Sequence, residues 1–284
     1  MDQNLNSGGQ RQSALVNDVP TSSLEPAELK SCCAAVYQSE WARLLLGDSF
    51  HPGGLTLSEH LASLAGVTSE SRVLDVAAGT GATALFLAEQ FGCQVVGLEY
   101  GPELVARANQ AAENAGLGGR VRFQQGDAEK LPFDDGSFDV ILCECAYCTF
   151  PNKAAAASEF ERVLRRGGRL ALSDLTRSGQ LPSELDGLLA WISCIADAQP
   201  VDSYLSYIET AGLNVDLVEN HNRALYQTVD DIRGKLLGAE LLLKLKKTDL
   251  PGADFGQAKR VARVASEAVR QGKLGYSLFI ARSI

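Results

Sequence analysis

The sequence predicts a doubly wound α/β fold on three observations. The apolar stretch 73–76 runs directly into the glycine-rich turn 77–81, Ala-Ala-Gly-Thr-Gly. Residues 83–91 then carry apolar side chains at helical spacing, so that strand, turn and helix form an opening unit. Residues 138–143, Phe-Asp-Val-Ile-Leu-Cys, form the near-continuous apolar run that buried parallel strands show. A turn of this kind presents backbone N–H groups and a positive helix end to a ligand.

The same periodicities predict the other elements in chain order. Further strands are expected over 94–98, 121–125, 169–175, 213–219 and 275–281, the last pairing at the sheet edge. Further helices are expected over 25–46, 55–65, 102–115, 154–164, 182–196, 203–211, 229–245 and 255–269. Gly167 and Gly168 predict the end of the helix 154–164. In the loop 48–54, Phe50 and His51 are expected to approach the glycine turn.

The chain divides into four predicted segments. Residues 1–25 are rich in Gln, Asn, Ser and Gly and predict a disordered leader. Residues 26–72 predict a helical cap, and 73–221 the core of the fold. Residues 222–284 predict a helical elaboration that ends in the closing edge strand.

Composition excludes several classes of function. The formal net charge of -9 argues against a nucleic-acid partner, which would call for a basic face. No apolar run reaches the roughly 18 residues of a membrane span, and no signal-peptide core follows Met1, so a cytoplasmic location is predicted. The seven cysteines are then expected to be reduced thiols, available for metal binding, catalysis or burial. The oligomeric state stays open.

The glycine turn alone is compatible with nicotinamide and flavin enzymes, and Ala77 stands where a first glycine is expected. Its context is more informative. Asp75 lies in the strand before the turn, and Glu99 ends the second strand, where an acid can accept both ribose hydroxyls of a nucleoside. Asp127 follows the third strand at the edge where ligands sit, and is placed for an adenine amino group.

Residues 73–175, with this order of motifs, resemble the class I S-adenosylmethionine-dependent methyltransferases. The resemblance implies a Rossmann-like, seven-stranded sheet whose last strand is antiparallel. It also implies that two glycines of the turn lie against the methionine part of the cofactor, that Glu99 holds the ribose, and that Asp127 and Ala128 frame the adenine. The implied cofactor-binding set is Asp75, Ala77, Gly79, Gly81, Glu99, Tyr100, Asp127, Ala128 and Cys143. A dinucleotide dehydrogenase is the rival interpretation.

Six cysteines are predicted to lie near the cofactor. Thiols lie after the fourth strand, on the next apolar helix and on the N-terminal helix, as Cys143, Cys145, Cys148, Cys194, Cys32 and Cys33. Thiolates select soft, thiophilic ions. Cys93 lies away from this edge and is interpreted as structural, Cys143 is interpreted as a strand-end residue that lines the cofactor, and Cys148 is left open.

Two motifs resemble the arsenite methyltransferase family. Cys145 precedes Lys153 in Cys-Ala-Tyr-Cys-Thr-Phe-Pro-Asn-Lys, and Cys194 ends Trp-Ile-Ser-Cys. The resemblance implies that both cysteines are arsenic ligands and that the pair Cys32-Cys33 matches an N-terminal pair of the family. The family's further cysteine before the first strand is missing from 48–54, so Cys33 or Cys32 supplies the third sulfur or the substrate needs only two.

The predicted function is methyl transfer from S-adenosylmethionine to trivalent arsenic, as arsenite or methylarsenite. Thiolates would hold a pyramidal centre with its lone pair toward the methyl group, so that no general base is required. The resemblance implies a thiol reductant, glutathione or thioredoxin, as co-substrate. Two alternatives are kept. One is a carbon, oxygen or nitrogen methyltransferase of the ubiquinone type, which 127–133 and Ser173-Asp174 resemble. The other is a non-catalytic metalloid-binding protein.

Overall fold

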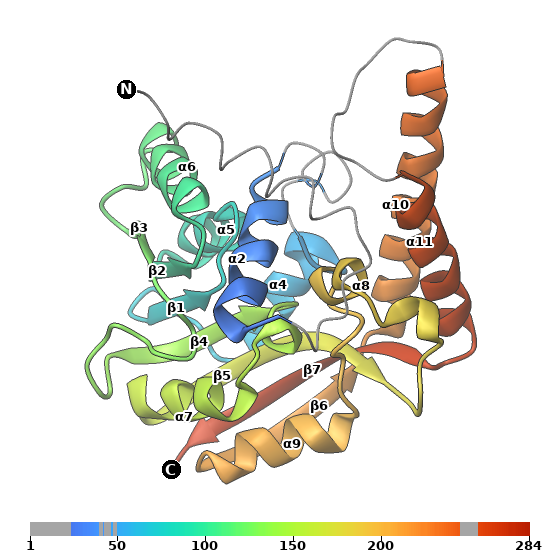
Figure 1. Ribbon diagram of the computed structural model, residues 1–284. Helices are drawn as coiled ribbons and strands as arrows, with labels where there is room; N and C mark the ends of the chain where they lie inside the picture. The colour runs from blue at the N-terminus through green and yellow to red at the C-terminus, as the bar shows by residue number, and fades with distance from the viewer. Residues whose placement is uncertain (1–23, 40–41, 43–46, 48–49, 245–254) are drawn as a thin grey trace, which may run out of the picture.

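The computed structural model describes residues 24–39, 42, 47, 50–244 and 255–284. The predicted leader therefore lies almost entirely outside the described residues. The described chain forms one seven-stranded sheet with helices on both faces (Figure 1), which confirms the predicted fold class. The strand order is β3-β2-β1-β4-β5-β7-β6. The strands are β1 Arg72–Val76, β2 Gln94–Glu99, β3 Val121–Gln125, β4 Phe138–Glu144, β5 Leu164–Arg177, β6 Leu213–Asn220 and β7 Leu274–Ser283.

Strands β1 to β5 are parallel, and β7 runs antiparallel to both of its neighbours. The order changes direction at β1, with β2 on one side and β4 on the other. In open α/β sheets ligands bind at the carboxyl ends of the strands beside such a switch point. The glycine turn after β1 and the cysteines after β4 therefore lie at this edge.

Two layers of helices bury the faces of the sheet. One hydrophobic cluster joins it to α4 Gly54–Leu64, α5 Ala82–Phe91, α6 Pro102–Asn114 and α11 Phe255–Arg270. The other joins it to α7 Lys153–Val163 and α9 Val201–Thr210. Near-complete burial of strands such as β1 explains their almost continuous apolar sequence.

The N-terminal helix and the C-terminal helices surround the carboxyl edge of the sheet. Helix α2 Pro26–Tyr37 packs on the short helix α8 Leu188–Ile192 through a small apolar cluster. Helix α10 Asn222–Lys244 packs against α11, and the pair rises on one side of the molecule (Figure 1). These helices supply the walls of the site described below.

Three element predictions are wrong. Gly167 and Gly168 were predicted to mark the end of the helix 154–164. Helix α7 does end within one residue of that bound, at Val163, but both glycines lie within β5, where its register against β4 shifts. The long helix predicted over 182–196 is broken into a 3₁₀ turn at Ser183–Leu185 and α8. The helix predicted over 25–46 ends at Tyr37, and most of its remainder lies outside the described residues.

The closing strand was expected at the sheet edge, but β7 lies between β5 and β6. Its side chains are buried on both faces at nine of ten positions, whereas those of β6 are more exposed at every second position. Alternation of this kind suits a strand with one solvated face. The patterning of the two segments therefore explains why β6 takes the edge.

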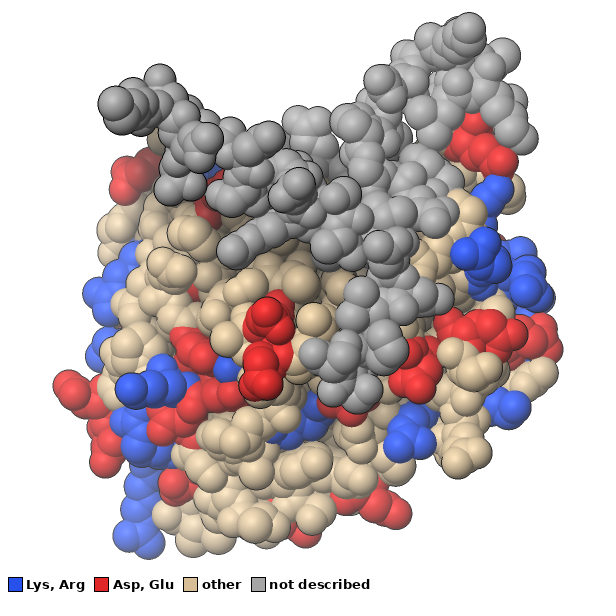
Figure 2. Space-filling model, viewed as in Figure 1, with Lys and Arg blue, Asp and Glu red and all other residues tan. Residues whose placement is uncertain are grey.

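Figure 2 shows how charged side chains are distributed over one face of the molecule. On the face drawn in Figure 2, acidic and basic side chains of the described residues are interspersed, without a continuous basic stripe. None of the helices within the described ranges has the length and apolarity that a bilayer crossing requires.

Candidate active site

The turn after β1 brings backbone to the ligand edge. Ala77, Gly79 and Gly81 all have positive φ, at 58°, 55° and 84°. A Cβ on Gly81 would lie 2.5 Å from Cζ of Phe123, which leaves no room for a side chain. A Cβ on Gly79 would lie 3.1 Å from Cδ2 of Phe50. Phe50 therefore lies beside the glycine turn, as expected from the sequence.

Glu99 organises the turn from the end of β2. Its Oε2 accepts a hydrogen bond from the Gly79 N–H at 3.0 Å, and its Oε1 accepts one from the Gly101 N–H at 2.8 Å. Burial raises the pKa of this carboxyl, and the backbone donors of Gly101 and Gly79 oppose the rise. Each oxygen keeps a lone pair for a ligand hydroxyl.

Two further carboxylates lie beneath the turn. Asp75 is 3% exposed, and its Oδ2 has no hydrogen-bond partner. Burial, with Glu144 and Glu99 nearby, raises its pKa well above the usual range. The Glu144 side chain is 4% exposed and accepts hydrogen bonds from Ser58 and Thr83, with His51 Nε2 3.5 Å away. A concentration of buried acidic groups with an orphaned oxygen favours a cationic ligand.

Asp127 is engaged by the N-terminal helix. The Lys30 ammonium contacts both of its oxygens, at 3.0 and 2.8 Å, and Glu129 at 2.6 Å. Burial alone would lower the pKa of Lys30, but the hydrogen bonds to Asp127 and Glu129 outweigh it and raise the pKa. The residue expected to meet an adenine amino group thus also anchors α2 over the edge of the sheet.

Two clefts meet above this edge. The first, about 840 Å³ including space open to solvent, is lined by α2, the glycine turn, Glu99, Asp127 and the residues after β4. The second, about 1000 Å³ by the same measure, is lined mainly by apolar side chains of α8, α10 and α11. Three residues line both, namely Tyr37, Phe50 and Cys145. These three residues form the boundary between the clefts. A molecule bound in one cleft would face a molecule bound in the other across them.

Cys145 and Cys194 converge at this boundary. The Cys194 thiol donates to the carbonyl oxygen of Cys145 at 2.9 Å. Both residues have positive φ, 51° for Cys145 and 63° for Cys194. With Ala77 they are the positive-φ residues other than glycine in the described chain, and strain of this kind clusters at functional sites.

The thiols differ in acidity. Hydrogen bonds from the thiols of Cys145 and Cys148 lower the pKa of Cys194 well below the ordinary thiol value, and Lys153 adds a favourable charge. The same contacts and burial raise the pKa of Cys145 and of Cys148. Ionisation of Cys194 turns its contact with the Cys145 carbonyl from attractive to repulsive. The hydrogen-bond donors that stabilise the Cys194 thiolate nevertheless outweigh the repulsion from this one carbonyl. Cys194 is therefore expected to be the first of the thiols to ionise.

The remaining cysteines are distributed unequally. Cys33 lines the first cleft, whereas Cys32 lines neither. Burial raises the pKa of Cys33, with a smaller effect from Cys194. Cys143 is fully buried in the core and lines neither cleft, and Cys93 donates to the Leu87 carbonyl away from the site. Over the described ranges, no three cysteine sulfurs lie within 4.8 Å of one another.

Sequence reasoning missed several residues of the site. Tyr37 lines both clefts and donates to the Ile192 carbonyl at 2.7 Å, which ties α2 to α8. Glu144 directly follows Cys143 at the carboxyl end of β4, a position that the strand-end rule marks. The buried Lys153 ammonium lies 5.7 Å from the centre of the Trp191 ring and pairs with Asp197. No sequence signal pointed to this last contact.

Comparison with known proteins places the fold in a family. Residues 67–212, just over half of the chain, match the family described as "Methyltransferase domain". The chain belongs to this methyltransferase domain family. The chain is 32% identical over 175 residues to the methyltransferase GfsG of Streptomyces halstedii, covering 61% of this chain and 62% of that protein.

One further relative and one solved structure are also similar to this chain. A demethylmenaquinone methyltransferase of Thermus thermophilus is 43% identical over 102 residues, which are 36% of this chain and 46% of that one. The fold is similar to that of Haemonchus contortus phosphoethanolamine N-methyltransferase 2, with a TM-score of 0.73 at 18% identity, covering 88% of this chain and 57% of the other. The chain thus spans about half to three fifths of the length of these relatives.

Proposed function

We propose that this protein transfers a methyl group from S-adenosylmethionine to a soft acceptor held by Cys145 and Cys194, with trivalent arsenic as the preferred acceptor. One observation carries the proposal. Cys145 lines both clefts, and Cys194, whose sulfur lies 2.9 Å from the Cys145 carbonyl oxygen, lines the second. An acceptor bound to these sulfurs would lie at the boundary between the clefts.

The first cleft fits the cofactor by charge. S-adenosylmethionine supplies a methyl group on a positively charged sulfur and also carries an ammonium group. Asp75, Glu99 and Glu144 are acidic groups buried around the glycine turn, and the unpartnered Oδ2 of Asp75 suits a cationic donor. The free lone pairs of Glu99 suit the ribose hydroxyls. Asp127 pairs with Lys30, and its carboxylate would use its remaining lone pairs for the adenine amino group.

The second cleft fits a soft acceptor. Cys194 is the first thiol to ionise and would form the first bond to arsenic, because thiolates are the nucleophilic and ligating form of cysteine. Each sulfur that binds would replace one hydroxyl group of arsenite, and the proton of the Cys145 thiol would leave with that hydroxyl as water. Apolar side chains of α8, α10 and α11 line the rest of this cleft. Positioning across the boundary then supplies the catalysis, without a general base.

A small organic acceptor is the second candidate. The second cleft is largely apolar, with side chains such as Leu189, Ile192 and Val261 on its walls. GfsG and the demethylmenaquinone enzyme are named as methyltransferases, the latter for an organic acceptor. An apolar cleft of this size suits such a molecule.

Product analysis tests the proposal and separates the candidates. The protein is incubated with S-adenosylmethionine, glutathione and either arsenite or a panel of apolar organic acceptors that includes demethylmenaquinone, and products are identified by mass spectrometry. Methylated arsenic is the expected product. Methylation of an organic acceptor with none of arsenite would favour the second candidate. Failure to bind S-adenosylmethionine by calorimetry would contradict both and favour a metalloid-binding protein.

A further inference from the structure

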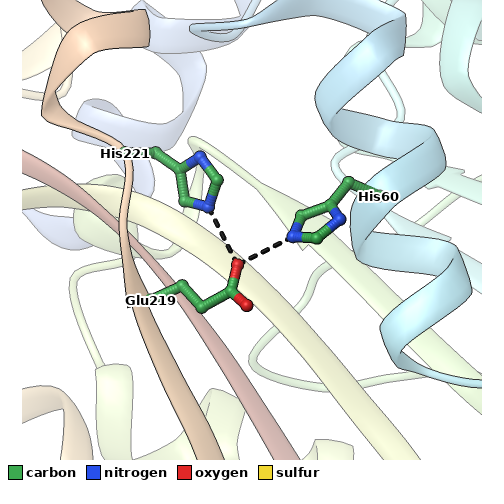
Figure 3. Close-up of side chains that lie close together, drawn as sticks. All are labelled: His60, Glu219 and His221. Atoms are coloured by element: carbon green, nitrogen blue, oxygen red, sulfur yellow. Dashed lines mark hydrogen bonds and ion pairs between the residues drawn. The ribbon is translucent and has the colours of Figure 1, made fainter.

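A second cluster of ligating side chains lies outside the two clefts (Figure 3). His60 lies on α4, Glu219 lies near the end of β6, and His221 lies just before α10. They include two of the three histidines in the sequence. Nε2 of His60 lies 2.7 Å from Oε2 of Glu219, and Nε2 of His221 lies 3.0 Å from the same oxygen. All three side chains are partly exposed, and none lines either cleft.

The ligand atoms of these three side chains all lie within 4.8 Å of one another. Among the described residues, this is the group of three or more His, Cys, Asp or Glu side chains that meets this distance. Two imidazoles and one carboxylate form a donor set that divalent transition metals accept. Ligands about 2.0–2.2 Å from a zinc ion stand about 3.3–3.6 Å apart in a tetrahedron. The two observed N···O distances, 2.7 and 3.0 Å, are shorter, so rotations of these partly exposed side chains would be needed to admit the ion.

We propose that His60, Glu219 and His221 form a binding site for a divalent transition metal of the Zn²⁺ class, with solvent completing the coordination. The inference is independent of the proposed methyl transfer. It differs from a purely hydrogen-bonded cluster in one respect: the metal requires both Nε2 atoms to be free of protons, whereas donation to Glu219 requires that they carry them.

The position of the site suggests what the metal does. It would join α4 to the junction of β6 and α10. The carbonyl oxygen of His221 accepts a hydrogen bond from the Ala224 N–H at 2.9 Å, at the beginning of α10. The backbone N–H of His221 donates to the Tyr276 carbonyl at 2.7 Å. Leu225, one turn further on, lines the second cleft. A bound metal would therefore fix the start of the helix that walls the acceptor cleft.

Metal binding is tested on untagged, full-length protein freed of metal with a chelator. Calorimetry with Zn²⁺ is expected to show one equivalent bound through this site, and His60→Ala and His221→Ala are each expected to weaken it at least tenfold. Glu59 is exposed and directly precedes His60, so Glu59→Ala is the matched control. This variant is expected to bind Zn²⁺ as wild type does. Glu219→Gln keeps the size of the side chain and is also expected to weaken binding.

Co²⁺ spectroscopy separates this site from the thiols. Ligation by nitrogen and oxygen gives visible bands without the intense near-ultraviolet absorption of thiolate ligation, and the bands are expected to disappear in His60→Ala. Circular dichroism establishes that each variant is folded, and Zn²⁺ is expected to raise the melting temperature of wild type more than that of the variants. Thiolate-type absorption at one equivalent, unchanged binding in both histidine variants, or absence of binding by wild type would each overturn the proposal.

Discussion

The thiol of Cys194 lies 2.9 Å from the carbonyl oxygen of Cys145, a residue 49 positions earlier in the chain. Each residue adopts a left-handed backbone conformation that costs about 1–3 kcal/mol for a non-glycine residue. The Cys145 N–H donates to the Ser173 carbonyl at 2.7 Å, which holds its turn against β5. The fold thus maintains two strained cysteines in contact where two clefts meet, which is the arrangement expected of a site that holds a ligand through sulfur.

The acidity of Cys194 is the first testable consequence. Because hydrogen bonds from Cys145 and Cys148 lower its pKa, one thiol is expected to ionise below the ordinary thiol range. Ultraviolet absorbance of the thiolate during a pH titration measures this. The low step is expected to vanish in Cys194→Ser and to move to higher pH in Cys145→Ala, which lacks a donor. Cys93→Ser is the control, and a low step that persisted in Cys194→Ser would assign the acidity to another thiol.

The proposed contact of Glu99 with the cofactor ribose gives a second prediction. Glu99→Gln replaces one carboxylate oxygen by an amide nitrogen, which cannot accept a hydrogen bond. Either a hydrogen bond from a backbone N–H or one from a ribose hydroxyl is therefore expected to be lost. A hydrogen bond to a charged group contributes about 1.5–3 kcal/mol, so the Kd for S-adenosylmethionine is expected to rise roughly tenfold to a hundredfold. Calorimetry measures the Kd. Glu103→Gln, at a largely exposed position, is expected to leave it unchanged, and an unaltered Kd in Glu99→Gln would remove the ribose assignment.

Gly81 tests the packing of the turn. Alanine there has an unfavourable φ of 84° and a Cβ only 2.5 Å from Phe123. Gly116, with a φ of 71° and open space around it, isolates the cost of the backbone conformation. Gly116→Ala is expected to lower the free energy of unfolding by about 1–2 kcal/mol, and Gly81→Ala by about 1–3 kcal/mol more. Urea denaturation measures both, and equal losses would show that the turn tolerates a side chain.

Asp174 gives stability a pH dependence. Burial raises its pKa from 3.8 to about 7, with Cys194 adding to the rise and the Cys148 hydrogen bonds opposing it. Between these two values the folded protein holds a proton that the unfolded chain releases. The contribution of Asp174 to stability is therefore complete at low pH and is lost as the pH rises through about 7.

Urea denaturation at several pH values measures this dependence. The free energy of unfolding is expected to fall by up to about 1.4 kcal/mol per pH unit in that window. The fall is expected to be shallower in Asp174→Asn, because the amide does not titrate, whereas Asp75 and Glu99 keep their raised pKa values. Parallel pH profiles in the two proteins would contradict the raised pKa.

Much of the sheet could be predicted from the sequence because its strands are buried and nearly uniformly apolar. The bounds of β3 agree at both ends, and those of β4 agree within one residue. The prediction failed where tertiary contacts override local signals. Gly168 lies at a shift in register rather than at a helix end, and a Cβ there would lie 2.8 Å from the carbonyl oxygen of Arg165 and 3.0 Å from that of Asp139, which leaves no room for a side chain.

The site was predicted unevenly for a related reason. Cys145 was expected beside the cofactor from its place at a strand end, and its convergence with Cys194 follows from the motifs that resemble the arsenite family. Tyr37, Lys153 and Trp191 are brought to the site by packing of α2, α7 and α8. Contacts between segments so far apart in the chain have no signature in a single sequence. Glu144, by contrast, could have been predicted as a site residue, because it too lies at the carboxyl end of a strand.

Arsenic methylation by matched cysteine variants tests the central claim most directly. Product formation from arsenite, S-adenosylmethionine and glutathione is measured for wild type, Cys145→Ser, Cys194→Ser and Cys93→Ser, with cofactor binding measured in parallel. Loss of at least a hundredfold in rate is expected for the first two variants, with cofactor binding retained, and no loss for Cys93→Ser. Full activity in both Cys145→Ser and Cys194→Ser would contradict the assignment of these thiols as the acceptor site.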